Sequence, residues 1–74
     1  MKLKKAVSLA IAAESLPSGT YWITSDRTGM LYLYERIEPK YYDNIWLGKG
    51  NATCLFRTYT GKKHWTKAIR KFEI

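Results

Sequence analysis

The chain has 74 residues, of which 46% are hydrophobic and 26% are charged, and its formal net charge is +7. This length corresponds to one small domain, 1–74, and this composition excludes an intrinsically disordered chain. A single cysteine and a single histidine exclude an internal disulfide and a zinc site built from these ligands. We therefore expect no metal or cofactor, so that the hydrophobic core or a second copy of the chain has to supply the stability.

The net charge lies at the two ends of the chain. Residues 1–5 contribute +3, residues 62–74 contribute +4, and the five bases and five acids between them cancel. Like charges gathered in two segments repel one another on folding unless an anionic partner offsets them. This distribution favours a binding function in which the terminal cations contact phosphates: Lys2, Lys4, Lys5, Lys62, Lys63, Lys67, Arg70 and Lys71.

The first predicted element is an amphipathic helix that runs to about Glu14. Its apolar residues recur at helical spacing on one side: Leu3, Val7, Ala10 and Ile11. Lysines in its first turn have the wrong sign for the positive end of the helix dipole, so they do not serve the helix. A basic start followed by apolar residues 6–13 also resembles a short export signal, but Ser8 interrupts the apolar run. We favour the helix and a cytoplasmic location.

From Thr20 onward the pattern alternates with a period of two, and β-branched and aromatic residues dominate. Four strands are predicted over residues 20–24, 30–37, 41–47 and 52–60. The first turn contains Gly29, which can take a positive φ, and Gly48-Lys49-Gly50-Asn51 forms a later tight turn. Short turns place successive strands side by side and antiparallel, so the simplest arrangement is a four-stranded meander.

After Gly61 the helical spacing returns. The apolar residues Trp65, Ala68, Ile69 and Phe72 fall on one third of a helix, and the opposite side gathers Lys63, Lys67, Arg70 and Lys71. A strand over this segment would mix the two groups on one face, although a strand can hold the last three residues. The predicted fold is therefore α+β, with an N-terminal helix, a four-stranded antiparallel meander and a short C-terminal helix.

The same alternation predicts an aliphatic and an aromatic face of the sheet. With Leu31, Leu33 and Ile37 toward the core, joined by Cys54 and Phe56, the other face gathers Trp22, Tyr32, Tyr34, Tyr42, Trp46 and Tyr59 with Arg36 and Arg57. An aromatic face with arginines can stack unpaired bases, at about 1–3 kcal/mol per base. A second buried layer, under a helix or a dimer partner, has the same composition. Trp22, Tyr32, Tyr34 and Trp46 contact bases only if this face is uncovered.

Motifs of catalysis and of known nucleic-acid-binding families do not occur. His64 stands beside lysines without a serine, cysteine or acid near it in sequence, and Cys54 is predicted to be a small hydrophobic residue on a strand. The glycine-lysine pairs lack the spacing of a phosphate-binding loop, and no segment is long enough to span a bilayer. The order of the predicted elements differs from that of an RNA-recognition domain. We expect a protein that is not an enzyme.

Two functions remain open. One is a non-enzymatic nucleic-acid-binding module, for DNA or RNA, that uses its basic termini for phosphate contacts. The other is a small protein-binding adaptor or inhibitor that docks on an acidic partner surface, because aromatic residues and arginine are also enriched at protein interfaces. Binding of the basic helix to an anionic membrane surface and formation of a homodimer through the aromatic face are weaker alternatives.

Overall fold

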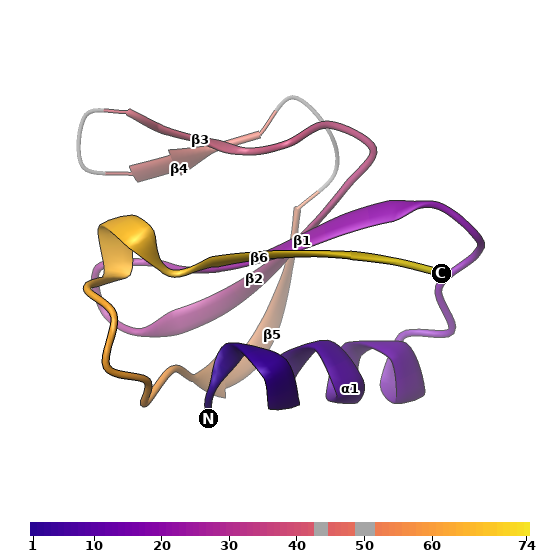
Figure 1. Cartoon of the computed structure of the whole chain (residues 1–74), viewed down its shortest axis with the longest axis horizontal. Coiled ribbons are helices and arrows are strands. Elements are labelled where there is room, and N and C mark those ends of the chain that lie inside the picture. Colours follow the sequence, from indigo (N-terminus) through magenta and orange to yellow (C-terminus); the bar gives the residue numbers. More distant parts are fainter. Residues whose placement is uncertain (43–44, 49–51) are drawn as a thin grey trace.

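A computed structural model shows a mixed α+β architecture in three layers (Figure 1). It describes residues 1–42, 45–48 and 52–74, without the side chains of Tyr42 and Ile45. The elements in chain order are α1 (Leu3–Ala13), β1 (Thr20–Ser25), β2 (Met30–Glu35), β3 (Lys40–Tyr42), β4 (Ile45–Leu47), β5 (Ala52–Thr58), the 3-10 turn η1 (Trp65–Lys67) and β6 (Ile69–Glu73).

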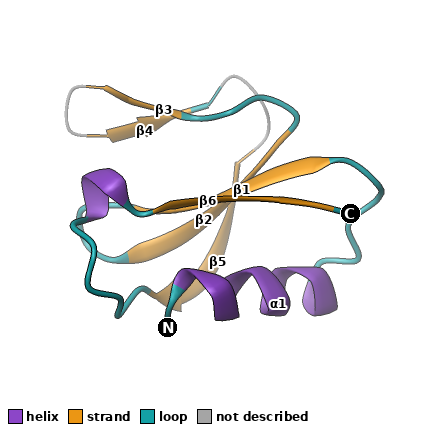
Figure 2. Cartoon of the chain, in the orientation of Figure 1, coloured by secondary structure: helices purple, strands orange, loops and turns teal. Residues whose placement is uncertain are grey.

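The central sheet contains four antiparallel strands in the order β5-β2-β1-β6. β1 and β2 form a hairpin in which Ile23 lies opposite Leu33, and β6 returns along the other edge of β1 with Phe72 opposite Tyr21. β3 and β4 pair with each other in a separate two-stranded sheet. Figure 2 shows that α1 lies along one face of the central sheet and that the β3-β4 hairpin lies on the opposite side.

The hydrophobic core lies between α1 and the central sheet. Ala6 and Ala10 of α1 are buried, and their small side chains let the helix approach the strands closely. The sheet side of this core consists of Tyr21, Ile23, Leu31, Leu33 and Leu55. The Tyr21 hydroxyl donates to Pro17 O at 2.6 Å, so the polar tip of this ring is satisfied. The helix-covered face is therefore closed and well packed.

The N-terminal helix and the first two strands agree with the sequence-based predictions. Leu3 and Val7 pack against the core as their spacing predicts, while Ile11, at the end of the predicted stripe, is 45% exposed. Gly29 takes a φ of +90° in the turn between β1 and β2. None of the helices in the described residues is long and apolar enough to cross a membrane.

The predicted C-terminal helix is wrong. Only the three-residue η1 is helical, and the segment after it is the strand β6. Without β6, the outer edge of β1 would present a row of unpaired backbone groups beside a buried strand, which is costly. Pairing satisfies that edge, and Phe72 stacks on the Tyr21 ring with centroids 5.5 Å apart. Arg70 and Phe72 therefore lie on one face of β6, and Ile69 and Lys71 lie on the other, as in any strand.

The predicted meander is also wrong, because the described residues of the segment 41–47 do not form a strand of the central sheet. They contribute instead to the β3-β4 hairpin, in which Tyr41 lies opposite Trp46. The two edges of the β1-β2 hairpin are already occupied by β6 and β5, which leaves this segment to pair with itself. The predicted turn at 48–51 lies, except for Gly48, outside the described residues. Period-two alternation identified a strand but not its partner.

The predicted core face fails at the ends of two strands. β2 ends at Glu35, Arg36 takes a φ of +72°, and Ile37 is 47% exposed instead of buried. In β5 Thr53 lies opposite the core residue Leu33 and Cys54 lies opposite Tyr32, so Leu55 enters the core in place of Cys54 and Phe56. Phe56 takes a φ of +53° and is 76% exposed. The register shifts between Met30 and Tyr32, where the step from Cys54 to Thr58 is two residues longer than the facing step in β2, so Tyr59 packs on the same side as Leu55.

Candidate nucleic-acid interface

The two lysine-rich segments lie side by side. The backbone N–H of Thr60 donates to Met1 O at 2.9 Å, and the amino group of Met1 donates to Thr58 O at 2.7 Å and to Thr60 Oγ1 at 2.6 Å. These bonds hold the start of α1 against the end of β5 and the segment that follows it. Figure 1 shows the N-terminus beside the chain that leads from β5 to η1.

A groove of about 320 Å³ opens where these segments meet. We call it the basic groove, and its lining residues are Lys2, Leu3, Lys4, Tyr59, Gly61, Lys62, Lys63, Ile69 and Arg70. Five of them are cations, and none is an acid. The ion pair that the structure shows, between Lys40 and Glu38, is elsewhere, and none of the five groove cations pairs with a carboxylate of the described residues. The groove therefore concentrates uncompensated positive charge.

Local structure positions these cations. α1 begins without a capping side chain or an acid in its first turn, so the lysines there do not stabilise the helix. Tyr59 packs against the core, and its hydroxyl accepts the backbone N–H of Lys63 at 3.2 Å. A side chain at Gly61 would collide with the Tyr59 ring, so only glycine lets the chain pass this close. Tyr59 thus anchors the loop that presents Lys62 and Lys63.

Three of the eight predicted phosphate contacts lie outside the basic groove. Lys5 on α1, Lys67 in η1 and Lys71 in β6 are exposed, but they do not line it. Lys71 lies opposite Trp22 in the β1-β6 pair, so it belongs to the sheet face that carries the hairpin. Their roles in binding stay predictions.

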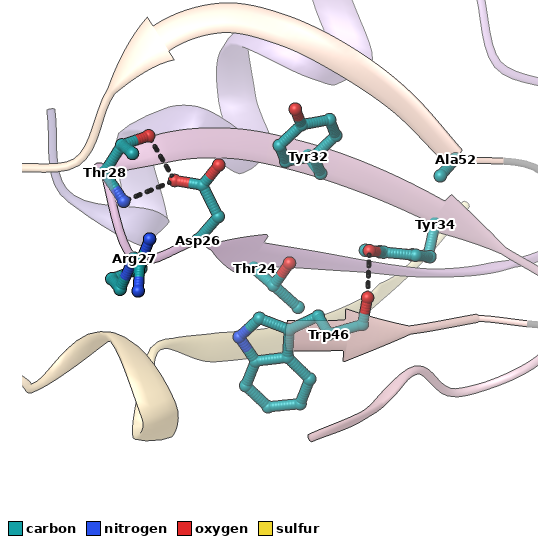
Figure 3. A pocket seen from close by; sticks show the side chains of 8 residues that line it. All are labelled: Thr24, Asp26, Arg27, Thr28, Tyr32, Tyr34, Trp46 and Ala52. Carbon is teal, nitrogen blue, oxygen red and sulfur yellow. Dashed lines mark hydrogen bonds between the residues drawn. The ribbon is translucent and has the colours of Figure 1, made fainter. Parts of the chain in front are cut away.

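The predicted aromatic contacts divide between buried and partly exposed residues. Trp22 and Tyr34 are each only 6% exposed, so neither lies on an open surface, although Tyr34 lines the cavity described next. Tyr32 and Trp46 are half-buried and line a cavity of about 430 Å³ between the hairpin and the central sheet. We call this cavity the hairpin pocket; its lining residues are Thr24, Asp26, Arg27, Thr28, Tyr32, Tyr34, Trp46 and Ala52 (Figure 3).

Hydrogen bonds and ring contacts hold the hairpin over this pocket. The Tyr34 hydroxyl donates to Trp46 O at 3.3 Å, and Trp46 Nε1 donates to Trp65 O at 3.3 Å. Tyr41 meets the rings of Trp46 and Trp65 edge to face, with centroids 6.0 and 5.2 Å apart. Trp46 is therefore fixed by contacts with β2 and with η1.

The polar groups of the hairpin pocket come from the turn after β1. Asp26 Oδ1 accepts the N–H of Thr28 at 2.9 Å, the hydroxyl of Thr28 at 2.7 Å and the N–H of Met30 at 2.8 Å. Such bonds from an aspartate to the following backbone fix a tight turn. Two buried atoms on this side of the sheet, Thr24 Oγ1 and Trp22 Nε1, have no hydrogen-bond partner among the described residues.

The two pocket tyrosines remain protonated at neutral pH. The pKa of Tyr32 lies above the ordinary 10.0, first because the Cys54 thiolate opposes a second negative charge, and then through desolvation and Asp26. Burial raises the pKa of Tyr34, and a weak interaction with the Thr24 hydroxyl, which falls short of hydrogen-bond geometry, partly offsets the shift. Both phenols therefore present O–H groups rather than charges.

The described residues show no cluster of side chains that could bind a metal ion. No three side chains of histidine, cysteine, aspartate or glutamate lie close enough there to hold a metal ion. His64 Nδ1 lies 2.9 Å from Thr66 Oγ1 at the start of η1, and Cys54 is half-buried opposite Tyr32.

Sequence reasoning identified the groove cations but missed other residues of both cavities. Tyr59 was assigned to the aromatic sheet face, and Gly61 was considered only as a break before a helix and as part of a rejected phosphate-binding loop. Thr24 and Asp26 were not singled out, although Asp26 and Gly29 mark a turn whose aspartate accepts backbone hydrogen bonds. In comparisons with known proteins, no family model, curated protein or solved structure matches this chain.

Proposed function

We propose that this protein is a non-enzymatic nucleic-acid-binding module whose basic groove contacts phosphates. One observation supports this above all: no described lining residue of the basic groove carries a carboxylate, while five of them, from the two ends of the chain, are cations, namely Lys2, Lys4, Lys62, Lys63 and Arg70. Cations this close repel one another, and a bound polyanion relieves that repulsion while releasing its own counterions.

A polymer of phosphates fits this charge arrangement better than a single small anion. Lys5 adjoins Lys4 on α1, and Lys67 lies two residues before Ile69, so exposed positive charge continues along the chain beyond the groove. Arg70 can bind one phosphate through two parallel N–H groups, whereas the lysines act as point charges. We place the protein in the cytoplasm, a proposal supported by the packing of α1 on the core through Ala6 and Ala10.

The first test is the salt dependence of binding to labelled single strands and duplexes of DNA and RNA. Contacts from five groove cations predict a slope of log K against log salt of about −3.5 for single strands and about −4.5 for duplexes. Fluorescence anisotropy at several salt concentrations gives this slope. An affinity that does not change with salt would contradict the proposal.

Two double variants with the same change in net charge locate the contacts. We expect Lys62→Glu with Lys63→Glu to weaken binding strongly, and to reduce the single-strand slope by about 1.4, because both residues line the groove. Lys67→Glu with Lys71→Glu is the matched comparison, and it should weaken binding less, since these exposed residues lie outside the groove. Equal losses in the two variants would show that net charge, not the groove, governs binding.

The alternative function is that of a small adaptor or inhibitor on an acidic protein surface. The exposed aromatic ring of Phe56 favours it, because aromatic residues are enriched at protein interfaces. Under this hypothesis Phe56→Ala weakens the recovery of a protein partner after nuclease treatment and leaves nucleic-acid affinity unchanged. A homodimer is a further proposal, which light scattering at several protein concentrations tests.

A further inference from the structure

The hairpin pocket has the size and lining of a small-ligand site. Its volume of about 430 Å³ lies within the usual range for ligand pockets, about 300–1,000 Å³. Three of its walls are the rings of Tyr32, Tyr34 and Trp46, and the hydrogen bonds of Trp46 and Tyr34 keep two of these rings in place. Aromatic walls of this kind bind flat rings by stacking.

The Thr24 hydroxyl supplies a polar group that the fold itself does not use. Thr24 is 1% exposed, and its Oγ1 has no hydrogen-bond partner among the described residues. Figure 3 shows this hydroxyl between Tyr34 and Trp46, among the side chains that line the pocket. A buried hydroxyl without a partner destabilises a protein, and valine would fill the same space without that cost. A ligand that bonds to Thr24 removes the penalty.

Asp26 adds an acceptor to the same pocket. Its Oδ1 holds the turn through three hydrogen bonds, from Thr28 and Met30, whereas its Oδ2 makes none with the described residues. A carboxylate oxygen can only accept, so it selects a ligand that donates an N–H group. Arg27, beside Asp26, is exposed and is the one cation among the described lining residues.

We propose that the hairpin pocket binds a flat nitrogen heterocycle with an exocyclic amino group, the chemistry that free nucleotides share with unpaired bases of a strand. The ring stacks against Tyr32, Tyr34 or Trp46. Asp26 Oδ2 accepts a hydrogen bond from the amino group, and the Thr24 hydroxyl bonds to a ring nitrogen. This proposal does not rest on the basic groove, because none of the groove cations lines the hairpin pocket.

The experiment is an NMR titration of the full chain with adenosine and with inosine, which carries a carbonyl in place of the amino group. We expect adenosine to shift the amide signals of Thr24 and Tyr32 and the indole signal of Trp46, with an affinity about tenfold above that of inosine. Absence of shifts at millimolar adenosine, shifts confined to the basic groove, or equal affinity for the two nucleosides would overturn the proposal.

Three variants separate binding from folding. Thr24→Val should bind adenosine about tenfold more weakly without loss of thermal stability, whereas Thr24→Ser, which keeps the hydroxyl, should retain binding. Asp26→Asn keeps an oxygen for the turn but removes the charge, and it should reduce the preference for adenosine over inosine. Unchanged affinity in Thr24→Val, together with an unchanged preference in Asp26→Asn, would show that neither group contacts the ligand.

A second titration, with AMP and with a short oligoadenylate, distinguishes the two sources of the base. Shifts in the hairpin pocket with AMP support a free nucleotide, and tighter binding of the oligonucleotide with shifts in both cavities supports a strand. The Lys62→Glu, Lys63→Glu variant should leave adenosine affinity unchanged, and Thr24→Val should leave the salt slope for a strand unchanged. These measurements therefore test the proposal for the basic groove and the proposal for the hairpin pocket independently of each other.

Discussion

The two faces of the central sheet are covered in different ways. On one face α1 packs through buried alanines, and the residues beneath it form a closed apolar cluster that includes Ile23 and Leu33. On the other face the two-stranded hairpin leaves a cavity of about 430 Å³, and the Thr24 hydroxyl and the Trp22 indole N–H are buried there without partners in the described part of the chain. We infer that the helix-covered face provides most of the stability. The hairpin-covered face contributes less stability and contains the cavity in which we propose that a ligand binds.

The largest effect should come from the helix-covered face. Ile23→Ala removes a fully buried side chain from the centre of the core, and we expect a loss of about 3 kcal/mol in the free energy of unfolding. A domain of this size has little stability to spare, so the variant should be partly unfolded at 37 °C. Urea denaturation followed by circular dichroism measures the loss. A cost below about 1 kcal/mol would show that this face is not the main core.

Trp22→Phe is the corresponding test on the hairpin-covered face. Phenylalanine is smaller than tryptophan by more than a methyl group, so packing is lost. The substitution also removes a buried N–H that has no partner among the described residues. Because loss of that unpaired group offsets part of the lost packing, we expect a cost of less than about 1.5 kcal/mol. The same denaturation experiment measures it. A cost equal to that of Ile23→Ala would erase the difference between the two faces.

Tyr34→Phe tests the attachment of the hairpin and its dependence on pH. At neutral pH the loss of the bond to Trp46 O should cost about 1 kcal/mol. Burial raises the pKa of Tyr34 in the folded protein above the ordinary 10.0, so the folded state holds this proton more tightly than the unfolded state. The contribution of Tyr34 is therefore complete below pH 10 and is lost as the pH rises through the folded-state pKa.

Denaturation of the wild type and of Tyr34→Phe at pH 8, 10 and 11 measures this contribution, because the other titrating groups are common to both proteins. The difference in stability between them should shrink as the pH rises. A constant difference would show that the Tyr34 hydroxyl is not buried beneath the hairpin.

The smallest effect should come from Phe56, which contributes to neither face. It takes a φ of +53° while its ring is 76% exposed, so its backbone is strained and its side chain adds little packing. Asparagine tolerates this conformation better, and Phe56→Asn should stabilise the protein by about 0.5–1 kcal/mol. Thermal unfolding should show a higher Tm. A lower Tm would indicate that the ring packs on the molecule after all.

The comparison of the two faces also explains which features the sequence could predict. Leu31, Leu33 and the helix residues were identified because local periodicity reports which side of an element is apolar. The segment of β6 was mistaken for a helix because its strand conformation depends on pairing with the open edge of β1. No local sequence pattern describes that edge. Phe56 was assigned to the wrong face because the register of β5, with Cys54 opposite Tyr32, is a long-range pairing that local alternation does not set.

The same limit applies to the candidate sites, because local features of the sequence could be predicted and long-range contacts could not. Charge at the chain ends predicted the groove cations, because their excess is visible in the sequence alone. The proximity of the two lysine pairs, Lys62 and Lys63 with Lys2 and Lys4, could not be predicted. It depends on long-range hydrogen bonds between Met1 and Thr60. Thr24 matters because its hydroxyl is buried without a partner among the residues that the structure describes, and this burial depends on the hairpin above it.

The pairing of β6 with β1 has a consequence for the order of assembly. β1 lies in the middle of the sheet, yet one of its edges is completed by residues 69–73, which a ribosome makes long after β1 itself. Until those residues emerge, a nascent chain exposes the edge beside Tyr21 and Ile23 to any other strand nearby. A chain truncated before Ile69 should therefore self-associate through this edge, and pairing with β6 removes that route to association.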